Sequence, residues 1–478
     1  MSLSACRRPA ARGAGIVLSQ RTPLARNQKT KYTSIQIGKS RNSGQSKPAS
    51  RQPIFSSNQS QSVQNRAAHL TNWLYFERYA NGVAPRPNNP LATYTEVDSA
   101  YRPGSPLPCY ELPTYKIPSD LCSIVLAPDA DLSVITKYLK RGEVHLPIFP
   151  QLCGDMSIPK MAEITKHPKS SVQVAPTAST RTVFVLEEDA PAHCLKTSLG
   201  PLRITRAVRG LDKTRIDHSI AVSKAISGCS DLVKNPKFAF LHESFGASYG
   251  HQKDSIGFLV REMIPRPFIQ EKHSMLPLFG LYSKDTRNPE ARATLINLIE
   301  ASDHDPETFV LESIYYPIIR GWVEIYLKTG AIIEAHGQNV SFEIDKDGVP
   351  GRAVFRDFDT FMRRKGLEMN GISTDGMNPF KLFEDEGTAD SPKTKVIMSL
   401  VYDHEMGTPF GRIAKVCEEE YGIPVERLQA KCRTYIRQIL PEADLHFPKD
   451  ETYNNKPGPI EPGKRAVFVQ TPDKPVWR

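Results

Sequence analysis

Residues 174–188 read VAPTASTRTVFVLEE, a polar loop that runs directly into an alternating segment. From residue 182 onward apolar and polar side chains alternate, which is typical of a half-buried β-strand. The loop gathers four hydroxyl side chains around one arginine, Arg181. Hydroxyl side chains alone predict no more than a turn, because Ser and Thr readily bond their own backbone. A cation among them indicates a site for an anion with many oxygens, which neutral donors and a planar guanidinium can hold together.

More regular elements follow this loop. Residues 237–244 (KFAFLHES) and 256–264 (IGFLVREMI) predict two further strands, partnered with each other. Between them and the loop, residues 215–235 carry apolar side chains at helical spacing and end before Asn-Pro, as a helix should. This half of the chain therefore predicts a mixed or antiparallel sheet.

Helical patterns dominate the second half of the chain and are interrupted by one hairpin. Asn288-Pro289 and Asp305-Pro306 indicate helix starts, because Pro is favoured in the first turn. We predict an α+β fold with several lobes, in which a sheet lobe precedes a mainly helical lobe that contains the inserted hairpin. The predicted elements are helices 288–303, 305–336 (kinked near Pro317) and 424–440, and hairpin strands 340–345 and 352–359.

The net charge of +10 is concentrated at the N-terminus. Residues 1–66 contain 12 Lys and Arg and no acidic residue, which leaves about −2 for the other 412 residues. A nearly neutral body does not indicate a nucleic-acid-binding surface. Because the segment is also poor in large apolar residues, we predict a disordered basic tail. Its composition is typical of a mitochondrial transit peptide, and an ordinary unstructured tail fits equally well.

Apolar runs and cysteines bear on the compartment. No apolar run approaches the roughly 18 residues that a membrane span requires. The eight cysteines include no Cys-x-x-Cys pair, a pattern that favours unpaired thiols in a reducing compartment. We therefore expect a cytoplasmic protein that does not associate with membranes. Scattered histidines without zinc-site spacing do not predict zinc.

Prolines suggest how the chain is divided. Residues 101–118 (YRPGSPLPCYELPTYKIP) predict neither a helix interior nor a central strand. We therefore expect a Pro-rich, truncated N-terminal lobe over residues 67–142. A sheet-rich, fingers-like lobe should follow over residues 143–285 and a helical, palm-like lobe over residues 286–478.

A second polar segment, residues 194–210 (CLKTSLGPLRITRAVRG), contains four cations and no acidic residue. In an extended strand Arg203 and Arg209 share a face, as do Lys196 and Arg206. A solvated basic strand would explain this pattern as well. The cations lie among Leu, Ile and Val, however, so we expect a bound anion to be their partner.

Two further segments supply oxygen ligands. EAHGQN (334–339) follows a helix end and FRDFD (355–359) lies on the return strand of the hairpin, which places Asn339 and Asp357 side by side. Such amide and carboxylate oxygens suit Mg²⁺, with phosphate and water completing its octahedron. His336 by itself would only indicate a helix-end histidine that complements the helix dipole. With the hydroxyl loop and the basic segment, the set contains every part of an ATP phosphate site.

The order of these motifs resembles that of the NRPS-independent siderophore synthetases of the IucA/IucC type. The motifs that carry the resemblance are, in sequence order, TASTRT, Lys196, Arg209, EAHGQN and the Arg-Asp pair of FRDFD. The resemblance spans roughly residues 140–440. Members of this family bind ATP in a cleft, adenylate a carboxylate of a polycarboxylic acid, usually citrate, and join the acyl group to an amine or hydroxyl. The resemblance therefore implies ATP and Mg²⁺ as cofactors, citrate or a related polycarboxylate and an amine as substrates, and a homodimer as the usual assembly.

The resemblance also assigns roles to individual residues. Arg209 and His336 match positions that bridge ATP and the carboxylate, so we expect them to be catalytic. His336 is also a candidate to take the proton that the amine must lose. Asn339 and Asp357 match the metal end. The residues that should bind the nucleotide are Ser179, Arg181, Thr182, Lys196, Glu334, Gln338 and Asn339.

The N-terminal region departs from the family pattern. The family's HP-x-HP-x-x-K stretch has no counterpart between residues 67 and 145. Phe149 stands where the family's HPWQ element has histidine. The resemblance therefore implies a member with a shortened N-terminal lobe.

Two other functions fit parts of the pattern. A catalytically impaired relative would bind ATP or citrate without turnover. A small-molecule kinase of the aminoglycoside-phosphotransferase kind also has a His-Gly motif, an Asn and a metal-binding Asp. Such kinases place a catalytic Asp two residues after the histidine, where this chain has Gln338, and a neutral amide cannot accept the hydroxyl proton.

Overall fold

The structure, a computed structural model, describes most of the chain beyond residue 69. The predictions for residues 1–66, a disordered tail and a transit peptide, lie outside the described residues. The described residues are 70, 72–81, 96–158, 160–187, 191–204, 207–208, 210–250, 255–269, 274–345, 348–386, 393–455 and 467–478.

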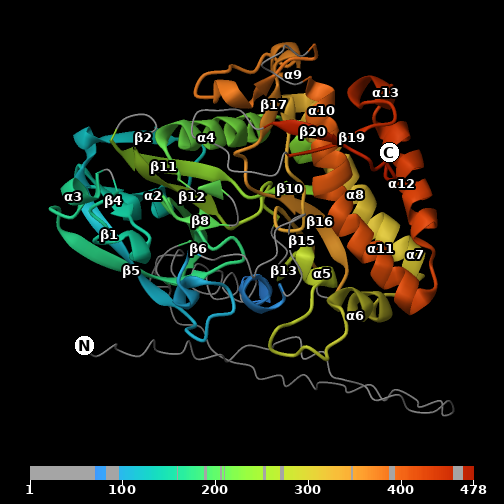
Figure 1. Cartoon of the computed structure of the whole chain (residues 1–478), viewed down its shortest axis with the longest axis horizontal. Helices are drawn as coiled ribbons and strands as arrows, with labels where there is room; N and C mark the ends of the chain where they lie inside the picture. The colour runs from blue at the N-terminus through green and yellow to red at the C-terminus, as the bar shows by residue number, and fades with distance from the viewer. Residues whose placement is uncertain are drawn as a thin grey trace, which may run out of the picture.

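A nine-stranded sheet forms one half of the molecule, at the left of Figure 1. All of its neighbouring strands run antiparallel. The segment predicted from residue 182 is its strand β6. In spatial order the strands are β2 (Cys122–Leu126), β11 (Glu243–Tyr249), β12 (Ile256–Glu262), β7 (His193–Thr197), β6 (Thr182–Val185), β5 (Lys169–Pro176), β1 (Tyr110–Pro118), β4 (Glu143–Pro147) and β3 (Leu139–Lys140).

Strand β1 corrects the expectation that residues 101–118 contain no central strand. It lies between β5 and β4 inside the sheet. Pro113 is tolerated there because the ladder to β4 begins only at Thr114, and the Pro113 carbonyl accepts a hydrogen bond from Ile148 N–H at 2.8 Å. Strands β1 to β3 thus belong to the same sheet as β5 to β7, while the lobe boundaries themselves remain predictions.

Helix α4 (Lys213–Ser227) lies across this sheet, against β11 and β12 (Figure 1). It begins after Asp212, whose carboxylate accepts the Arg215 N–H at 2.9 Å. This is the side-chain capping that Asp favours at a helix start. The helix predicted over residues 215–235 is therefore confirmed, although it ends earlier, at Gly228.

A four-stranded sheet lies between the nine-stranded sheet and the long helices (Figure 1). The predicted hairpin is confirmed as its antiparallel pair β15–β16. The pairing predicted for residues 237–244 is partly wrong: β10 pairs in parallel with β16, and only β11 pairs with β12. The strands, in spatial order, are β10 (Phe238–Phe240), β16 (Pro350–Phe355), β15 (Val340–Ile344) and β13 (Ser274–Pro277).

The helices of the second half pack against the four-stranded sheet and one another. Near the predicted kink, a π-helical segment (Leu311–Tyr315) directly precedes α8, so the helix changes type just before Pro317. The start predicted at Asn288 is wrong, because Asn288 forms a β-bridge with Asp285 instead. The helices are α5 (Phe279–Tyr282), α6 (Thr294–Ala301), α7 (Pro306–Val310), α8 (Tyr316–Thr329), α9 (Arg364–Met369), α10 (Thr394–Ser399), α11 (Gly407–Tyr421), α12 (Val425–Ile439) and α13 (Ala443–His446).

Smaller elements complete the fold, whose predicted α+β class is confirmed. Helix α2 (Leu132–Tyr138) packs on β4. Two small sheets border the long helices; their strands are β14 (Ala331–Ile332), β17 (Phe361–Arg363) and β18 (Leu382–Phe383), and β19 (Thr452–Asn455) and β20 (Phe468–Thr471).

Among the described residues, four apolar clusters stabilise these layers, the smallest of them between α4 and the nine-stranded sheet, around Ile216. One fills the helical half around Trp322, and a second lies within the nine-stranded sheet and its helices around Phe149. A third, smaller cluster around Trp73 joins side chains of both sheets. The two halves therefore have separate cores with a shared apolar contact between them.

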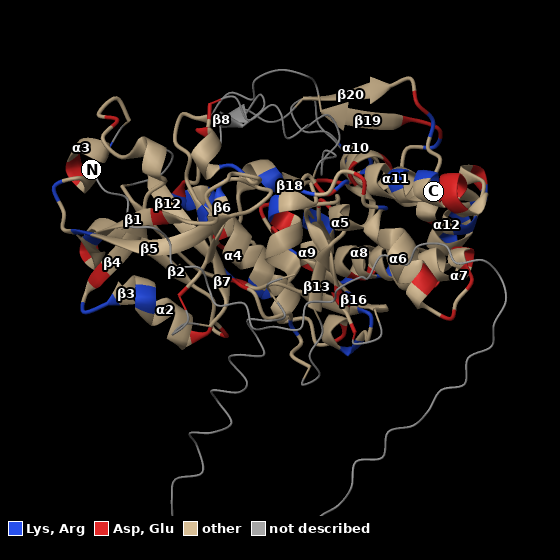
Figure 2. Ribbon diagram, turned by 90° about the horizontal axis from the view of Figure 1, so that it is seen from below, with Lys and Arg blue, Asp and Glu red and all other residues tan. Residues whose placement is uncertain are grey.

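Charge and thiols complete the description. Figure 2 shows Lys and Arg interspersed with Asp and Glu along both halves of the ribbon. Within the described ranges, no helix has the length and apolar character that crossing a bilayer would require.

Six of the described cysteines are free thiols.

Candidate functional site

The hydroxyl loop, residues 177–182, is held by its own hydrogen bonds. Thr177 Oγ1 donates to the Thr182 carbonyl at 2.6 Å, and Ser179 Oγ accepts the Thr182 N–H at 3.0 Å. Thr180 has φ +63° and donates its N–H to the Thr177 carbonyl at 2.9 Å. Some hydroxyls therefore shape the loop rather than meet a ligand. In the hydrogen bonds of the described residues the Ser179 hydroxyl only accepts, so its proton could be donated to an anion.

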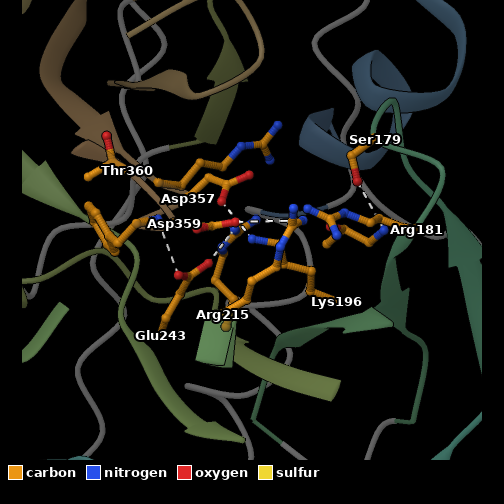
Figure 3. A network of polar contacts seen from close by, with 12 residues as sticks. Ser179, Arg181, Lys196, Arg215, Glu243, Asp357, Asp359 and Thr360 are labelled. Atoms are coloured by element: carbon orange, nitrogen blue, oxygen red, sulfur yellow. Dashed lines mark hydrogen bonds and ion pairs between the residues drawn. The ribbon is translucent and has the colours of Figure 1, made fainter. Parts of the chain in front are cut away.

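A buried ion pair lies directly beside this loop. Lys196 on β7 is opposite Thr182 on β6 in the sheet register. Its side chain is 1% exposed, and its Nζ lies 2.6 Å from Asp357 Oδ1. Asp357, with φ +71°, follows the end of β16 and keeps 28% of its side-chain surface exposed. The pair, labelled in Figure 3, thus joins the two sheets at a place that solvent can reach.

Three cations act on the Asp357 carboxyl. Burial by itself would raise its pKa, but Lys196, Arg261 and Arg181 outweigh burial and hold the pKa well below its usual range. Asp357 is therefore ionised throughout the physiological range. Arg181 also reaches towards the carbonyl of Gly210, 3.5 Å from its Nη1. The loop arginine and the buried lysine, both labelled in Figure 3, thus both lower the pKa of one carboxyl group, and the lysine contacts it directly.

Asp359 is a second carboxylate at this place that sequence reasoning did not single out. Burial would raise its pKa, yet Lys381 and Arg215 lower it below the usual range. Both cations lie 4.0 Å from a carboxylate oxygen of Asp359. Its Oδ1 is buried and has no hydrogen-bond partner among the described residues. Its place two residues after the predicted ligand Asp357, in FRDFD, was the signal that could have revealed it.

A buried ion pair that sequence reasoning also missed lies next to Asp357. Glu243 and Arg261 are opposite each other on β11 and β12, and Glu243 Oε1 accepts from Arg261 Nη2 at 2.5 Å. Both side chains are buried. Glu243 Oε2 accepts the Phe358 N–H at 3.2 Å. Charged residues inside the apolar strands KFAFLHES and IGFLVREMI were the signal that could have indicated this buried pair.

The turn of residues 334–339 is tied to the strand that carries Asp357. The Arg356 N–H donates to the Asn339 carbonyl at 3.0 Å, and Arg356 Nε donates to the Gln338 carbonyl at 2.7 Å. His336 is fully buried, and its Nδ1 accepts the Gln338 N–H at 3.1 Å. Because Nδ1 accepts this bond, a neutral His336 ring carries its proton on Nε2, and Nδ1 is its basic nitrogen. The Glu334 carbonyl accepts the His336 N–H at 2.9 Å.

The extended basic strand predicted over residues 194–210 is wrong. Strand β7 ends at Thr197, and two short strands, β8 (Arg203–Ile204) and β9 (Ala207–Val208), pair with each other in a separate sheet. The Gly-Pro pair that follows Leu199 favours this break, since both residues interrupt strands. Arg206 and the predicted catalytic Arg209 lie outside the described residues.

The sequence-predicted residues thus fall into two groups. Arg181, Lys196 and Asp357 meet in one network, with Ser179 and Thr182 in the adjoining loop. The second group lies in one turn, which is hydrogen-bonded to Arg356, the residue before Asp357. Its members are Glu334, His336, Gln338 and Asn339. The roles assigned to both groups remain predictions.

The donor set fits a Mg²⁺ that is shared with a phosphate. The described residues contain no group of three or more His, Cys, Asp or Glu side chains that could hold a metal alone. Mg²⁺ usually takes one or two carboxylates, with phosphate and water as its other ligands. Asp357 and Asp359 supply two carboxylates, one of them with an unpartnered buried oxygen. Asn339, the other residue predicted to bind Mg²⁺, is buried, with 5% of its surface exposed.

Two family models match this chain. The IucA / IucC family model matches residues 159–283, and that of the ferric iron reductase FhuF-like transporter matches residues 317–452. A curated relative, L-2,3-diaminopropanoate--citrate ligase of Staphylococcus aureus, is 28% identical over 206 residues. This match covers 40% of the chain and 33% of the relative, so the chain matches only one third of that protein's length.

Solved structures share the fold. The petrobactin biosynthesis protein AsbB of Bacillus anthracis superposes with a TM-score of 0.56 and 16% identity, over 77% of this chain and 68% of that protein. ATP-bound aerobactin synthetase IucA of Klebsiella pneumoniae superposes with a TM-score of 0.57 and 12% identity, over 82% of this chain and 76% of that protein. At these identities the similarity establishes the fold.

Proposed function

We propose that this chain, which belongs to the IucA/IucC family of NRPS-independent siderophore synthetases, is an ATP-dependent ligase that joins a polycarboxylate to an amine. The observation that carries the proposal is the ion pair between Lys196 of the larger sheet and Asp357, which follows a strand of the smaller sheet, at a partly exposed place where Arg181 also lowers the pKa of Asp357. Citrate is the acid that we propose, because the curated relative is named a citrate ligase. Cytoplasmic location and a homodimer remain predictions.

The first half-reaction explains the need for cations. A carboxylate oxygen attacks the α-phosphorus of ATP, the bond to the β-phosphate oxygen breaks, and pyrophosphate leaves. Two unit negative charges about 4 Å apart repel by about 4 kcal/mol at an effective dielectric constant of 20. One arginine hydrogen bond to a phosphate oxygen offsets about 1.5–3 kcal/mol. Arg181 and Lys196 are the residues proposed to supply such bonds, because charges that the fold already holds in position stabilise a transition state most effectively.

Asp357 and Asp359 would hold Mg²⁺ against the phosphates, with Asn339 as the further predicted ligand. The ion would supply positive charge to the departing pyrophosphate. Lys196, which is paired with Asp357 at 2.6 Å, is proposed to bind the same phosphates. No general base is needed at this stage, because a citrate carboxyl is already ionised near neutral pH.

The second half-reaction requires a proton to move. The amine nitrogen attacks the acyl carbon, the bond to the AMP oxygen breaks, and the nitrogen loses a proton. We propose that His336 takes this proton at Nδ1, which accepts the Gln338 N–H in the described structure and would give up that hydrogen bond when it is protonated. Arg209 is proposed to bridge the nucleotide and the acid, as the family resemblance implies.

The products test the proposal. The chain is incubated with ATP, Mg²⁺, citrate and a panel of amines, and the nucleotide products are separated by chromatography. We expect AMP and pyrophosphate in equal amounts, dependent on citrate. ADP as the product would identify a kinase instead, and nucleotide binding without turnover would identify an impaired relative.

The variants Arg181→Ala and His336→Ala test the assignment of the site residues. Arg181→Ala should reduce pyrophosphate release at least about 100-fold, as removal of a preorganised charge contact does. Arg292→Ala is the matched control, because Arg292 is exposed and pairs only with surface glutamates in the described structure, at 2.8 Å and 3.2 Å. Parent-like pyrophosphate release by Arg181→Ala would refute the site assignment.

A further inference from the structure

An N-terminal helix is built into the contact between the two sheets. Residues 72–79 are helical and lie between the nine-stranded sheet and α5, where Figure 1 draws them in blue. Trp73 is fully buried, and its ring lies 6.0 Å from that of Phe184 on β6. Its apolar neighbours come from β7 of the larger sheet and from β10, β13 and β16 of the smaller one. The helix therefore contacts both sheets at once.

Glu77 of this helix bridges the two groups of site residues. Its Oε2 accepts the Ala178 N–H at 3.0 Å, inside the hydroxyl loop. Its Oε1 accepts from Arg356 Nη2 at 2.5 Å. All three residues are buried, so neither bond competes with water. One carboxylate thus joins the loop of Arg181 to the residue that precedes Asp357.

Arg356 extends the bridge to the turn of residues 334–339. Its Nε donates to the Gln338 carbonyl at 2.7 Å, and its guanidinium carbon lies 5.4 Å from the Trp73 ring centroid. Trp73 and Glu77 are four residues apart and so lie on the same face of the helix. Both therefore hold the same arginine, one through the ring and the other through charge.

We propose that Glu77 is a positioning residue for the nucleotide site. It fixes the hydroxyl loop at a set distance from Asp357 and from the turn of residues 334–339, although it need not touch a substrate. This inference rests on the proposed function, because the groups that it spaces are those proposed to hold ATP. A misplacement of about 1 Å between such groups can cost about 100-fold in rate.

Substitution by glutamine removes the bridge with minimal change in shape. A carboxylate offers two acceptor oxygens, whereas an amide offers one acceptor and two donors. Glu77→Gln would therefore face either Ala178 N–H or Arg356 with a donor and could satisfy only one of them. Glu77→Asp keeps the charge but is one methylene shorter, so its carboxylate cannot span both partners.

A matched control lies on the hairpin. Glu343 and Arg352 form another buried pair with an Oε2–Nε distance of 2.5 Å, and neither residue contacts the hydroxyl loop through any hydrogen bond of the described structure. Glu343→Gln should lower the melting temperature about as much as Glu77→Gln, since each leaves a buried arginine without its counter-charge. The two variants therefore separate stability from positioning.

The experiment measures equilibrium binding of labelled ATP with Mg²⁺ to the full chain, together with KM for ATP. Glu77→Gln and Glu77→Asp should each weaken ATP binding and raise KM at least about 10-fold, at a temperature where circular dichroism shows them folded. Glu343→Gln should bind ATP like the parent. If Glu77→Gln does not fold, Glu77→Asp decides the question.

Parent-like ATP binding by the folded Glu77 variants would overturn the inference and leave the proposed function intact. An equal loss in Glu343→Gln would also overturn it, because the effect would then be general loosening. Absence of ATP binding by the parent would overturn the proposed function and the inference together.

Discussion

Lys196 and Asp357 show how a buried charged side chain is stabilised in this protein by an opposite charge. A lysine that is 1% exposed is strongly disfavoured without a counter-charge, and Asp357 supplies it at 2.6 Å. The carboxylate remains partly exposed, so the pair can still meet a ligand. Its function and its contribution to stability therefore have to be separated experimentally.

A double-mutant cycle separates them. Asp357→Asn alone leaves the lysine buried and unpaired and should cost about 3–5 kcal/mol of unfolding free energy. Adding Lys196→Met should restore most of that loss while pyrophosphate release stays absent. Urea denaturation and the product assay measure the two effects. A double variant no more stable than Asp357→Asn would contradict this account.

His193 predicts how stability depends on pH. Burial lowers its pKa from 6.5 to about 4. The Pro191 carbonyl lies 2.7 Å from Nδ1 and the Tyr138 hydroxyl 2.6 Å from Nε2, which suits a neutral ring with one donor and one acceptor. The unfolded chain takes up a proton as the pH falls below 6.5, while the folded chain does so only near pH 4.

Stability from His193 is therefore complete above pH 6.5 and is lost as the pH falls towards 4, in total about 3 kcal/mol. Urea denaturation at several pH values checks this. In His193→Gln the stability should fall less steeply between pH 6 and 4.5, by up to about 1.4 kcal/mol per pH unit. Identical slopes for the parent and the variant would argue against it.

At the residue scale the sequence predicted Arg181, Lys196 and Asp357, because each charge stands in a local pattern. Asp359 lies in the same motif, FRDFD, but the local pattern does not assign it a function. Glu243 and Arg261 were hidden inside apolar strands, and only the strand register brings them together. Such pairs depend on contacts between distant segments, which a local pattern does not contain.

At the element scale the hairpin β15–β16 was predictable, because its turn and its alternation are both local signals. Strand β1 was not, since its prolines argue against a central strand. Only its neighbours show where a missing N–H is tolerated. The left-handed conformations of Thr180 and Asp357 were also not predictable, because both are set by the loops around the site.

Two glycines within helices test packing at this scale. A Cβ on Gly321 of α8 would lie 2.7 Å from Phe355 Cε2, at the end of β16. Gly321→Ala should therefore lower the unfolding free energy by about 1–3 kcal/mol. Apart from the backbone of its own helix and its chain neighbours, the described residues place no atom within 4 Å of the Cβ position of Gly411 in α11. Gly411→Ala should raise stability by about 0.5–1 kcal/mol.

Thermal unfolding of both glycine variants checks these expectations. The pair is informative because the helix propensity gained is the same, so any difference in sign reflects the contact with Phe355. A melting temperature for Gly321→Ala at or above that of the parent would show that the strand end can move freely.

At the scale of the whole molecule, the two halves have separate cores that meet around Trp73. No local pattern predicts this contact, since it joins a helix near residue 75 to strands more than 100 residues later. The Pro-rich N-terminal region predicted as a truncated lobe thus contains a helix whose Glu77 bonds to both the loop of Arg181 and Arg356.

The contact around Trp73 predicts cooperative unfolding. The parent should unfold in one calorimetric transition, because the shared cluster couples the two cores. Trp73→Ala should cost about 3–5 kcal/mol and separate the unfolding into two transitions, one for each core. A single transition at lower temperature would mean that other contacts couple the halves.

The central claim is that this charged cluster brings a carboxylate to the α-phosphorus of ATP. The most direct test uses citrate labelled with ¹⁸O in its carboxyl groups, a saturating amine and mass spectrometry of the products. The account predicts one ¹⁸O atom in AMP for each amide formed, because the oxygen bound to phosphorus stays with AMP when the amine attacks. Appearance of ¹⁸O in inorganic phosphate, with ADP as the nucleotide product, would contradict it.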